Sequence, residues 1–139
     1  MSFLLDTNAI SEVVKPTPNA GLLEWLAQAD EDQTFLSAIT LMELRYGVER
    51  MRAGQRRSRL EHWLDQDLPA RFDRRILVVD RQVADMCGRL VARSESTGRR
   101  IETRDALIAA TAEIHRLTLV TRNIADFKTA VKNLLNPWS

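Results

Sequence analysis

The stretch MSFLLDTNAISEVV (residues 1–14) places a short apolar run, Phe3–Leu5, directly against the polar triplet Asp6-Thr7-Asn8. A continuous apolar run of this kind is typical of a strand buried on both faces of a parallel sheet. Asp, Thr and Asn favour the start of a helix, where a side-chain oxygen accepts a free backbone N–H. The stretch therefore predicts a buried strand that passes straight into a helix. Asp6 is then either a helix cap or a functional carboxylate.

The same pattern recurs along the chain. Further short apolar runs occupy residues 35–36, 76–79, 117–120 and 134–135. Between them lie stretches with helical spacing, marked by Leu22, Leu23, Trp25 and Leu26, by Ile39, Met42, Tyr46 and Met51, by Val83, Met86, Cys87, Leu90 and Val91, and by Leu107, Ile108, Thr111 and Ile114. Residues 15–19 (KPTPN) predict a turn between two helices. Strand and helix alternate, with extra helices after the second strand, which predicts an α/β sandwich with a mainly parallel sheet.

Length and composition are those of an ordinary globular protein, with 45% hydrophobic and 28% charged residues among 139. We expect one domain over residues 1–139. No apolar run approaches a membrane span, and the N-terminus lacks the pattern of a secretion signal. Cys87 is the only cysteine, which excludes an internal disulfide and fits a reducing compartment. We therefore expect a cytoplasmic protein without a membrane partner.

Charge is unevenly distributed along the chain. Residues 45–104 carry 15 of the 20 Lys and Arg residues and 9 of the 19 Asp and Glu residues, a net charge of +6, and the remainder carries −5. A basic middle beside an acidic remainder is compatible with a polyanionic partner near an acidic site. Well-solvated helix surfaces explain the same composition.

Several polar residues fall where the predicted strands end, which is where parallel sheets bind ligands. They are Asp6, Ser37 with Glu43 shortly after it, Asp80, and Thr121-Arg122-Asn123; Asp105 opens the helix before the fourth strand. Each acid has an ordinary structural explanation. Asp6 and Asp80 suit helix caps. Glu43 suits a capping box with Thr40, unless the helix already begins near Ser37. Asp105 suits the first turn after a Thr103 cap.

Taken together, Asp6, Glu43 and Asp105 predict more than three caps. Three carboxylates in one cleft repel each other, and they need a cation or raised pKa values to coexist. An all-oxygen set of ligands is the kind that Mg²⁺ or Mn²⁺ prefers. His62 and His115 are too few and too badly placed for a zinc cluster, and the sequence has no GxxxxGK[ST] loop, GxGxxG loop or nucleophile elbow.

Four segments in order also carry a family resemblance. They are LLDTNAISE (residues 4–12), LSAITLMELRYG (residues 36–47), DALIAATA (residues 105–112) and LVTRNIADF (residues 119–127), followed by NPW at residues 136–138. In these segments the sequence resembles the PIN-domain ribonucleases, specifically the VapC/FitB toxins of bacterial type II toxin–antitoxin modules. The resemblance implies a PIN-like three-layer α/β/α sandwich whose mainly parallel central sheet has about five strands.

The resemblance also implies roles for individual residues. Asp6, Glu43 and Asp105 match the family's acidic catalytic and metal positions. Asn123 stands at a fourth metal position that is often Asp, which leaves open whether one ion or two bind. Supporting roles fall to Thr7, Asn8, Thr121 and Asp126. We expect Thr7 or Asn8 to share the capping of the helix and leave the Asp6 carboxylate for metal, and Asp126 to cap the turn before Phe127.

The implied activity is that of a metal-dependent endoribonuclease using Mg²⁺ or Mn²⁺, which lowers the pKa of water and offsets charge on the scissile phosphate. From charge alone, Arg45, Arg50 and Arg52 are candidates for holding RNA phosphates. The implied partners are a second copy of the chain, a VapB-like antitoxin, and operator DNA bound by the toxin–antitoxin assembly. Trp25, Trp63 and Tyr46 are candidates for the apolar surface that such partners need.

Three other functions can be weighed. An aspartyl-phosphate phosphatase begins DxDxT after its first strand, and Asn8 excludes that motif. A receiver-like signalling domain needs paired acids after the first strand and a Lys after the last, and neither is present. A PIN-like protein without effective catalysis, acting as the binding subunit of an antitoxin–DNA complex, stays open because Asn123 replaces an acid.

Overall fold

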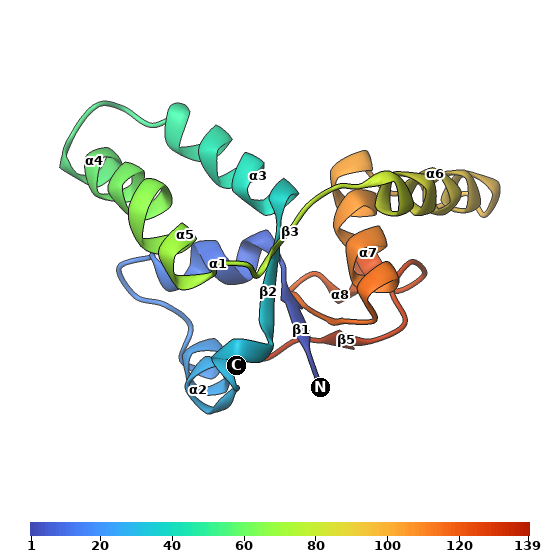
Figure 1. Ribbon diagram of the computed structural model, residues 1–139, viewed down its shortest axis with the longest axis horizontal. Helices are drawn as coiled ribbons and strands as arrows, with labels where there is room; N and C mark the ends of the chain where they lie inside the picture. Colours follow the sequence, from blue (N-terminus) through green and yellow to red (C-terminus); the bar gives the residue numbers. More distant parts are fainter.

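A five-stranded parallel sheet forms the centre of the protein (Figure 1). The computed structural model describes residues 1–139. The strands are β1 (Phe3–Leu5), β2 (Thr34–Ser37), β3 (Ile76–Leu77), β4 (Thr118–Val120) and β5 (Leu134–Leu135), in the order β3-β2-β1-β4-β5. The helices are α1 (Thr7–Val13), α2 (Ala20–Gln28), η1 (Glu31–Gln33), α3 (Ala38–Glu49), α4 (Gln55–His62), η2 (Trp63–Asp67), α5 (Leu68–Arg71), α6 (Arg81–Ser96), α7 (Thr103–His115) and α8 (Ile124–Phe127). None of them is long and apolar enough to cross a membrane.

Helices cover both faces of the sheet, as the predicted sandwich requires. In Figure 1, α1 to α5 lie on one side of the strands and α6 to α8 on the other. Successive strand residues alternate between the two cores: Leu4 packs with α6 and α7, whereas Leu5 packs with α1, α2 and α3. Leu119 and Val120 of β4 alternate in the same way. The continuous apolar runs therefore reflect burial on both faces, as predicted.

The predicted strands and helices are confirmed, with two differences in detail. The third apolar run was expected to span residues 76–79, but pairing with β2 ends at Leu77, and Val78 and Val79 are exposed. In α3 the predicted apolar stripe holds at Ile39, which packs against the core, but is wrong at Met42 and Tyr46, which are 47% and 57% exposed. The face that packs on the core instead carries Thr40, Leu44 and Val48. Both sets of residues have helical spacing, so the spacing could not choose between them.

The C-terminal residues return to α2 and leave no room there for a side chain. A Cβ at Gly21 would lie 2.6 Å from the Pro137 carbonyl oxygen and 2.7 Å from the Ser139 nitrogen. The Asn19 side chain accepts from the Ser139 N–H at 3.1 Å. The tail also places the Trp138 ring 6.0 Å from the Arg122 guanidinium, in the loop that follows β4. The tail thus packs against the segment that carries Thr121 and Asn123.

This close approach makes an unusual prediction for a helix. Alanine normally stabilises a helix relative to glycine by ~1 kcal/mol, but we expect Gly21→Ala to lower the free energy of unfolding by about 1–3 kcal/mol through overpacking against the tail. Urea denaturation measures this change. In a chain ending at Asn136 the same substitution should be neutral or stabilising. An equal loss of stability in both chains would contradict the proposed clash.

Candidate active site

Asp6 and Thr121 meet at the carboxyl ends of two neighbouring strands. Leu5 of β1 is in register with Val120 of β4, so the residues that follow them are adjacent. The Thr121 hydroxyl donates to Asp6 Oδ2 at 2.7 Å, and the Asp6 backbone N–H donates to the Val120 carbonyl at 2.9 Å. Both side chains are buried, Asp6 to 5% exposure and Thr121 completely. The predicted supporting role of Thr121 therefore has a direct contact behind it.

Asp6 is both a helix cap and a buried carboxylate. Its Oδ1 accepts from the Thr7 backbone N–H at 2.8 Å, which caps α1. The Asn8 amide donates to Asp6 Oδ2 at 3.3 Å and to the Thr121 hydroxyl at 3.2 Å. The expectation that Thr7 or Asn8 would share the capping and leave the Asp6 carboxylate free is wrong, because Asp6 Oδ1 itself caps α1 and Oδ2 accepts from Asn8. Burial raises the pKa of Asp6, the bonds from Thr121 and Thr7 oppose this, and Glu43 and Asp126 raise it further.

Glu43 lies inside α3 and is held by threonine hydroxyls. The helix begins at Ala38, and the Ser37 hydroxyl accepts from the Ile39 N–H at 3.0 Å as its cap. The capping box of Thr40 and Glu43 is therefore wrong, and the earlier start near Ser37 is confirmed. Thr7 donates to Glu43 Oε1 at 2.8 Å, and the Thr7 and Thr40 hydroxyls lie 3.0 Å apart. Because the Thr7 proton goes to Glu43, Thr40 is the donor in the second bond.

Thr40 is the site residue that sequence reasoning missed. It is completely buried, and its hydroxyl joins α3 to α1 through Thr7. The available signal was a Thr three residues before Glu43, which also fits a capping box. Only the position of the helix start decides between the two roles. The hydroxyl chain from Thr40 through Thr7 orients one oxygen of Glu43.

Asp105 occupies the first turn of α7, as predicted, although Glu102 rather than Thr103 is the cap residue. The Glu102 side chain makes no capping hydrogen bond, so no side chain caps the first backbone amides of α7. Burial and, to a smaller extent, the charges of Asp6, Glu43, Asp126 and Glu102 together raise the pKa of Asp105 to about 6. This repulsion indicates that the three predicted acids lie within electrostatic reach of one another.

Asn123 and Asp126 lie on the exposed side of the same strand end. The Asn123 backbone N–H donates to the Thr121 hydroxyl at 3.0 Å, and no hydrogen bond involves its side chain. Asp126 falls in the first turn of α8, and the predicted capping by its side chain is not observed. Its charge nevertheless raises the pKa values of both Asp6 and Asp105. Asp126 thus adds negative charge that Asn123 does not supply.

One cation of the chain itself reaches these acids. Arg104 Nη1 lies 3.7 Å from Glu43 Oε2, and its Nη2 lies 4.0 Å from Glu102 Oε2. The Arg104 side chain is 51% exposed, so water weakens both attractions. Glu43 therefore has one oxygen on Thr7 and the other facing Arg104.

The donor chemistry suits a hard divalent cation, because every candidate ligand is an oxygen. In this arrangement no three acidic, histidine or cysteine side chains stand close enough to share one ion. Asp6 and Glu43 are instead engaged by hydroxyls, an amide and Arg104. Asp105 nevertheless forms no ion pair, and its pKa is raised by burial and by the charges of the neighbouring acids. Asp6, Glu43 and Asp105 are the residues that would hold a metal, with Asn123 at the rim.

The arginines predicted to hold RNA lie away from the three acids or are already engaged. Arg45 forms an ion pair with Asp65. Arg50 stacks over Tyr46, 5.3 Å from the ring centre. Seven residues of helix separate Arg50 from Glu43, a rise of about 10 Å. Arg52 is exposed in the loop before α4 and has no ion pair.

Comparison with known proteins identifies the family of the chain. The PIN domain family matches residues 3–132. The chain belongs to the PIN domain family. It is 38% identical over 135 residues to the toxin FitB of Neisseria gonorrhoeae and 35% identical over 135 residues to the VapC ribonuclease Y4jK of Sinorhizobium fredii. These alignments cover 97% of this chain in both cases, and 97% of FitB and 96% of Y4jK.

The fold agrees equally well with a solved PIN-domain complex. The structure of FitAB bound to the IR36 DNA fragment has a chain that superposes with a TM-score of 0.92 and 36% identity, covering 99% of this chain and 96% of that chain. The predicted resemblance to VapC/FitB PIN proteins and the predicted three-layer fold are therefore confirmed.

Burial of the Asp105 carboxyl, together with repulsion from the neighbouring acids, makes a prediction about stability. The folded protein binds a proton between about pH 4 and 6 that the unfolded chain has lost, so its stability falls as the pH rises through about 6. We expect Asp105→Asn to raise the free energy of unfolding at pH 7.5 by about 1–3 kcal/mol and to flatten the dependence on pH. Thermal unfolding without divalent cations, measured from pH 4 to 8, tests this. Equal stability of variant and wild type at pH 7.5 would contradict the raised pKa of Asp105.

Proposed function

We propose that this protein is the toxin of a type II toxin–antitoxin module and a metal-dependent endoribonuclease that hydrolyses RNA phosphodiester bonds. The observation that carries the proposal is the convergence of Asp6, Glu43 and Asp105, which come from three separate segments and share one electrostatic environment. An acid that only caps a helix, or that lies alone on the surface, has no other acids close enough to raise its pKa. The ribonuclease name of Y4jK and the toxin name of FitB support the same function.

Mg²⁺ or Mn²⁺ bound by these acids supplies Lewis-acid chemistry, lowering the pKa of water and offsetting phosphate charge. The residues of the chain hold and orient the carboxylates that would bind the metal. Thr121 and Asn8 fix the Asp6 carboxylate, and the Thr40–Thr7 hydroxyl pair fixes Glu43. Such supporting bonds keep ligand oxygens in place and strengthen metal binding.

Substitution of the acids tests the activity. We expect Asp6→Asn and Glu43→Gln to reduce cleavage of structured RNA by about a hundredfold or more, because each removes a charged metal ligand while keeping the side-chain shape. EDTA should abolish cleavage by the wild type. The measurement is the initial rate on protein purified without any antitoxin.

Asp80→Asn is the matched control for these variants. Asp80 also follows a strand, and its Oδ1 caps α6 by accepting from the Val83 N–H at 2.9 Å, so Asn should preserve that role. Its rate should equal that of the wild type. Unchanged cleavage by Asp6→Asn and Glu43→Gln would show that the site is assigned wrongly.

Metal binding can be measured without RNA. We expect Mn²⁺ to raise the melting temperature of the wild type, with a stabilisation of about 3 kcal/mol at one hundred times the dissociation constant. Asp6→Asn should lose most of this effect. Arg104→Ala should bind Mn²⁺ more tightly, because Arg104 competes for Glu43.

Arg89→Ala is the control for Arg104→Ala. Arg89 forms an exposed ion pair with Asp85 on α6, so its removal has the same change of charge without touching Glu43. The Mn²⁺ effect in this variant should match the wild type. A stabilisation by Mn²⁺ that survives in Asp6→Asn would place the ion elsewhere.

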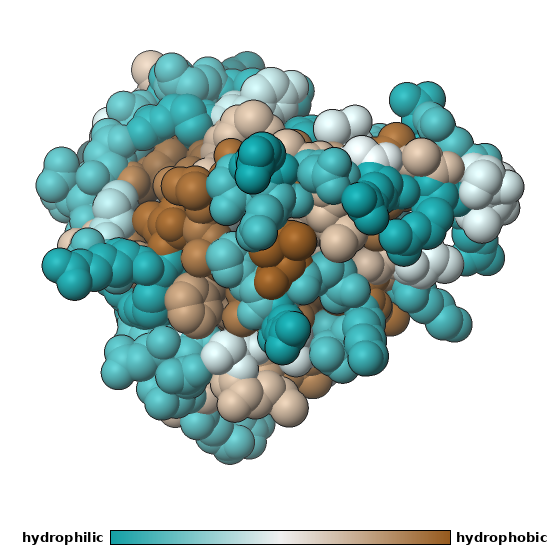
Figure 2. All heavy atoms as spheres, turned by 45° about the vertical axis from the view of Figure 1, so that its right-hand side comes forward, coloured by the Kyte–Doolittle hydropathy of each residue, from teal (hydrophilic) through white to brown (hydrophobic).

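The proposed partners are a VapB-like antitoxin, operator DNA and a second copy of the chain. An apolar groove of about 520 Å³ opens between α1, α2 and the η2–α5 segment, lined among others by Ile10, Leu23, Trp63 and Phe72. It suits an apolar segment of a protein partner. Figure 2 shows apolar atoms gathered on the surface over the centre and left of that view. The DNA in the FitAB complex supports the wider assembly.

The predicted aromatic anchors differ in exposure. Tyr46 is exposed on α3 and accompanies Met42, which supports a contact surface for a second copy. Trp63 lines the apolar groove, as described. Trp25 packs edge-on against Phe3, with ring centres 4.9 Å apart, and belongs to the core.

A binding subunit with little catalysis is the second candidate. The observation that favours it is that Glu43 faces Arg104 and that Asn123 brings no charge to the fourth position. Absence of RNA cleavage by the wild type, together with normal cell growth when it is expressed alone, would establish this second function in place of the first.

A further inference from the structure

A polar cleft of about 380 Å³ lies directly beside Asp105, and the proposed nuclease function does not account for it. Its walls are the α6–α7 loop, the first turn of α7, α8, and Thr129, two residues beyond the end of α8. The charged and polar side chains that line it are Arg99, Arg100, Glu102, Asp105, Asp126 and Thr129. We call it the arginine cleft. It connects one of the three acids with two arginines of the basic middle.

The loop that carries these arginines is fixed on both sides. Gly98 has a φ of 77°, a conformation that glycine adopts without strain, and it turns the chain back after α6. The Arg99 N–H then donates to the Ser94 carbonyl at 3.0 Å, and the Ile101 N–H donates to the Ser94 hydroxyl at 3.1 Å. Ser94 is itself buried. The backbone of Arg99 and Arg100 is thus held in place while their side chains remain exposed.

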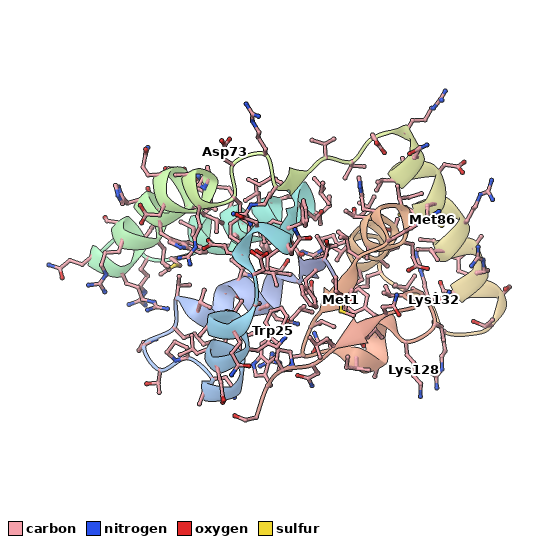
Figure 3. All side chains as sticks on the ribbon, turned by 60° about the horizontal axis from the view of Figure 1, so that its bottom comes forward. Met1, Trp25, Asp73, Met86, Lys128 and Lys132 are labelled. Atoms are coloured by element: carbon pink, nitrogen blue, oxygen red, sulfur yellow. The ribbon has the colours of Figure 1, made fainter.

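A second cleft continues from the first. It has a volume of about 440 Å³, shares Thr129 with the arginine cleft, and runs between α6 and the end of α8. Its basic lining residues are Arg93, Lys128 and Lys132, and Glu113 is its one acidic lining residue. In Figure 3, Lys128 and Lys132 lie on the same side of the molecule as Met86 of α6, which also lines this cleft. We call the two clefts together the basic track.

The positive charge of the track is available to a ligand. Arg93, Arg99 and Lys128 form no ion pair, and Arg100 has only a distant contact of 3.7 Å to Glu95. Arg45, in contrast, is paired with Asp65. Screening also favours the track, because charges in 0.1 M salt act over a Debye length of about 10 Å. Arg99 and Arg100 line the same cleft as Asp105, whereas Arg50 lies about 10 Å of helix rise from Glu43.

We propose that the basic track binds one single-stranded arm of the RNA substrate, with Arg99 and Arg100 contacting the phosphates next to the scissile one. The inference rests on the proposed nuclease function. Arginine donates paired hydrogen bonds to phosphate oxygens, and a positive cleft that follows the backbone is how proteins hold single strands. The track offsets the repulsion between RNA and the three acids where the strand enters the site. Lys128 and Arg93 contact phosphates farther along the strand.

The test measures binding and cleavage of one defined RNA by the full chain. The probe is a fluorescein-labelled oligouridylate of about 12 nucleotides, with anisotropy recorded in EDTA at several salt concentrations. We expect Arg99→Ala/Arg100→Ala to weaken binding about tenfold and to reduce the slope of log K against log salt by about 1.4, for two lost phosphate contacts. In Mg²⁺ the variant should raise KM and leave kcat within about twofold of the wild type.

Two further variants separate local contacts from general charge. Arg56→Ala/Arg59→Ala removes the same charge from α4, on the other side of the sheet (Figure 1), at two exposed residues without ion pairs. It should bind RNA like the wild type. Arg99→Lys/Arg100→Lys should retain the salt slope of the wild type, because the charges remain.

The outcomes distinguish the two proposals. A wild type that cleaves RNA, together with an Arg99→Ala/Arg100→Ala variant that binds within twofold of it, overturns the basic track and leaves the nuclease function standing. Equal weakening by Arg56→Ala/Arg59→Ala also overturns the track, because any two charges then suffice. A wild type that neither binds nor cleaves RNA overturns the nuclease function itself, and the track with it.

Discussion

The hydrogen bond from the buried Thr121 hydroxyl to Asp6 is the interaction on which the site depends. A carboxylate only 5% exposed needs donors, because an unpaired buried charge costs several kcal/mol. The parallel pairing of β1 and β4 supplies one donor from a neighbouring strand, and the start of α1 supplies the others. The sheet register is therefore also a condition on the chemistry. A shift of one residue between β1 and β4 would separate Asp6 from Thr121 and leave the acid unsatisfied.

The other two acids differ in the number of hydrogen-bond donors that they receive. Glu43 is held by a hydroxyl chain that begins at buried Thr40 and passes through Thr7, a residue of the helix that Asp6 caps. One short segment, Asp6 to Asn8, thus orients two carboxylates. Asp105 receives no comparable donors, and its pKa is raised to about 6. The site is consequently well ordered at Asp6 and Glu43 and electrostatically unbalanced at Asp105, which is the kind of imbalance that marks functional sites.

Most of the architecture could be predicted from the sequence, because strands that are covered on both faces require continuous apolar runs. Those runs located β1 to β5, and the acids at their ends located the site. Predictions that depended on a helix start or a helix face were less secure. Thr40, Ser37 and Thr103 are all acceptable caps by residue type, and only packing showed that Ser37 caps α3 and that Thr40 is buried in a hydroxyl chain. The stripe of Met42 and Tyr46 failed for the same reason, since two faces of α3 have helical spacing.

Charge composition points to a region of the chain but does not choose among its residues. Residues 45–104 are basic, but a count of charges cannot distinguish an arginine paired with Asp65 from one that lines a cleft. Tertiary structure makes this distinction by bringing the α6–α7 loop to Asp105, while Arg50 lies about two helical turns beyond Glu43. The acids of the site repel a polyanionic substrate. Only basic residues close to those acids can offset this repulsion, because salt screens charges that are farther away. Ser94 and Gly98 hold the backbone of Arg99 and Arg100 beside Asp105. Because only the backbone is held, the two guanidinium groups remain in water and do not neutralise the acids.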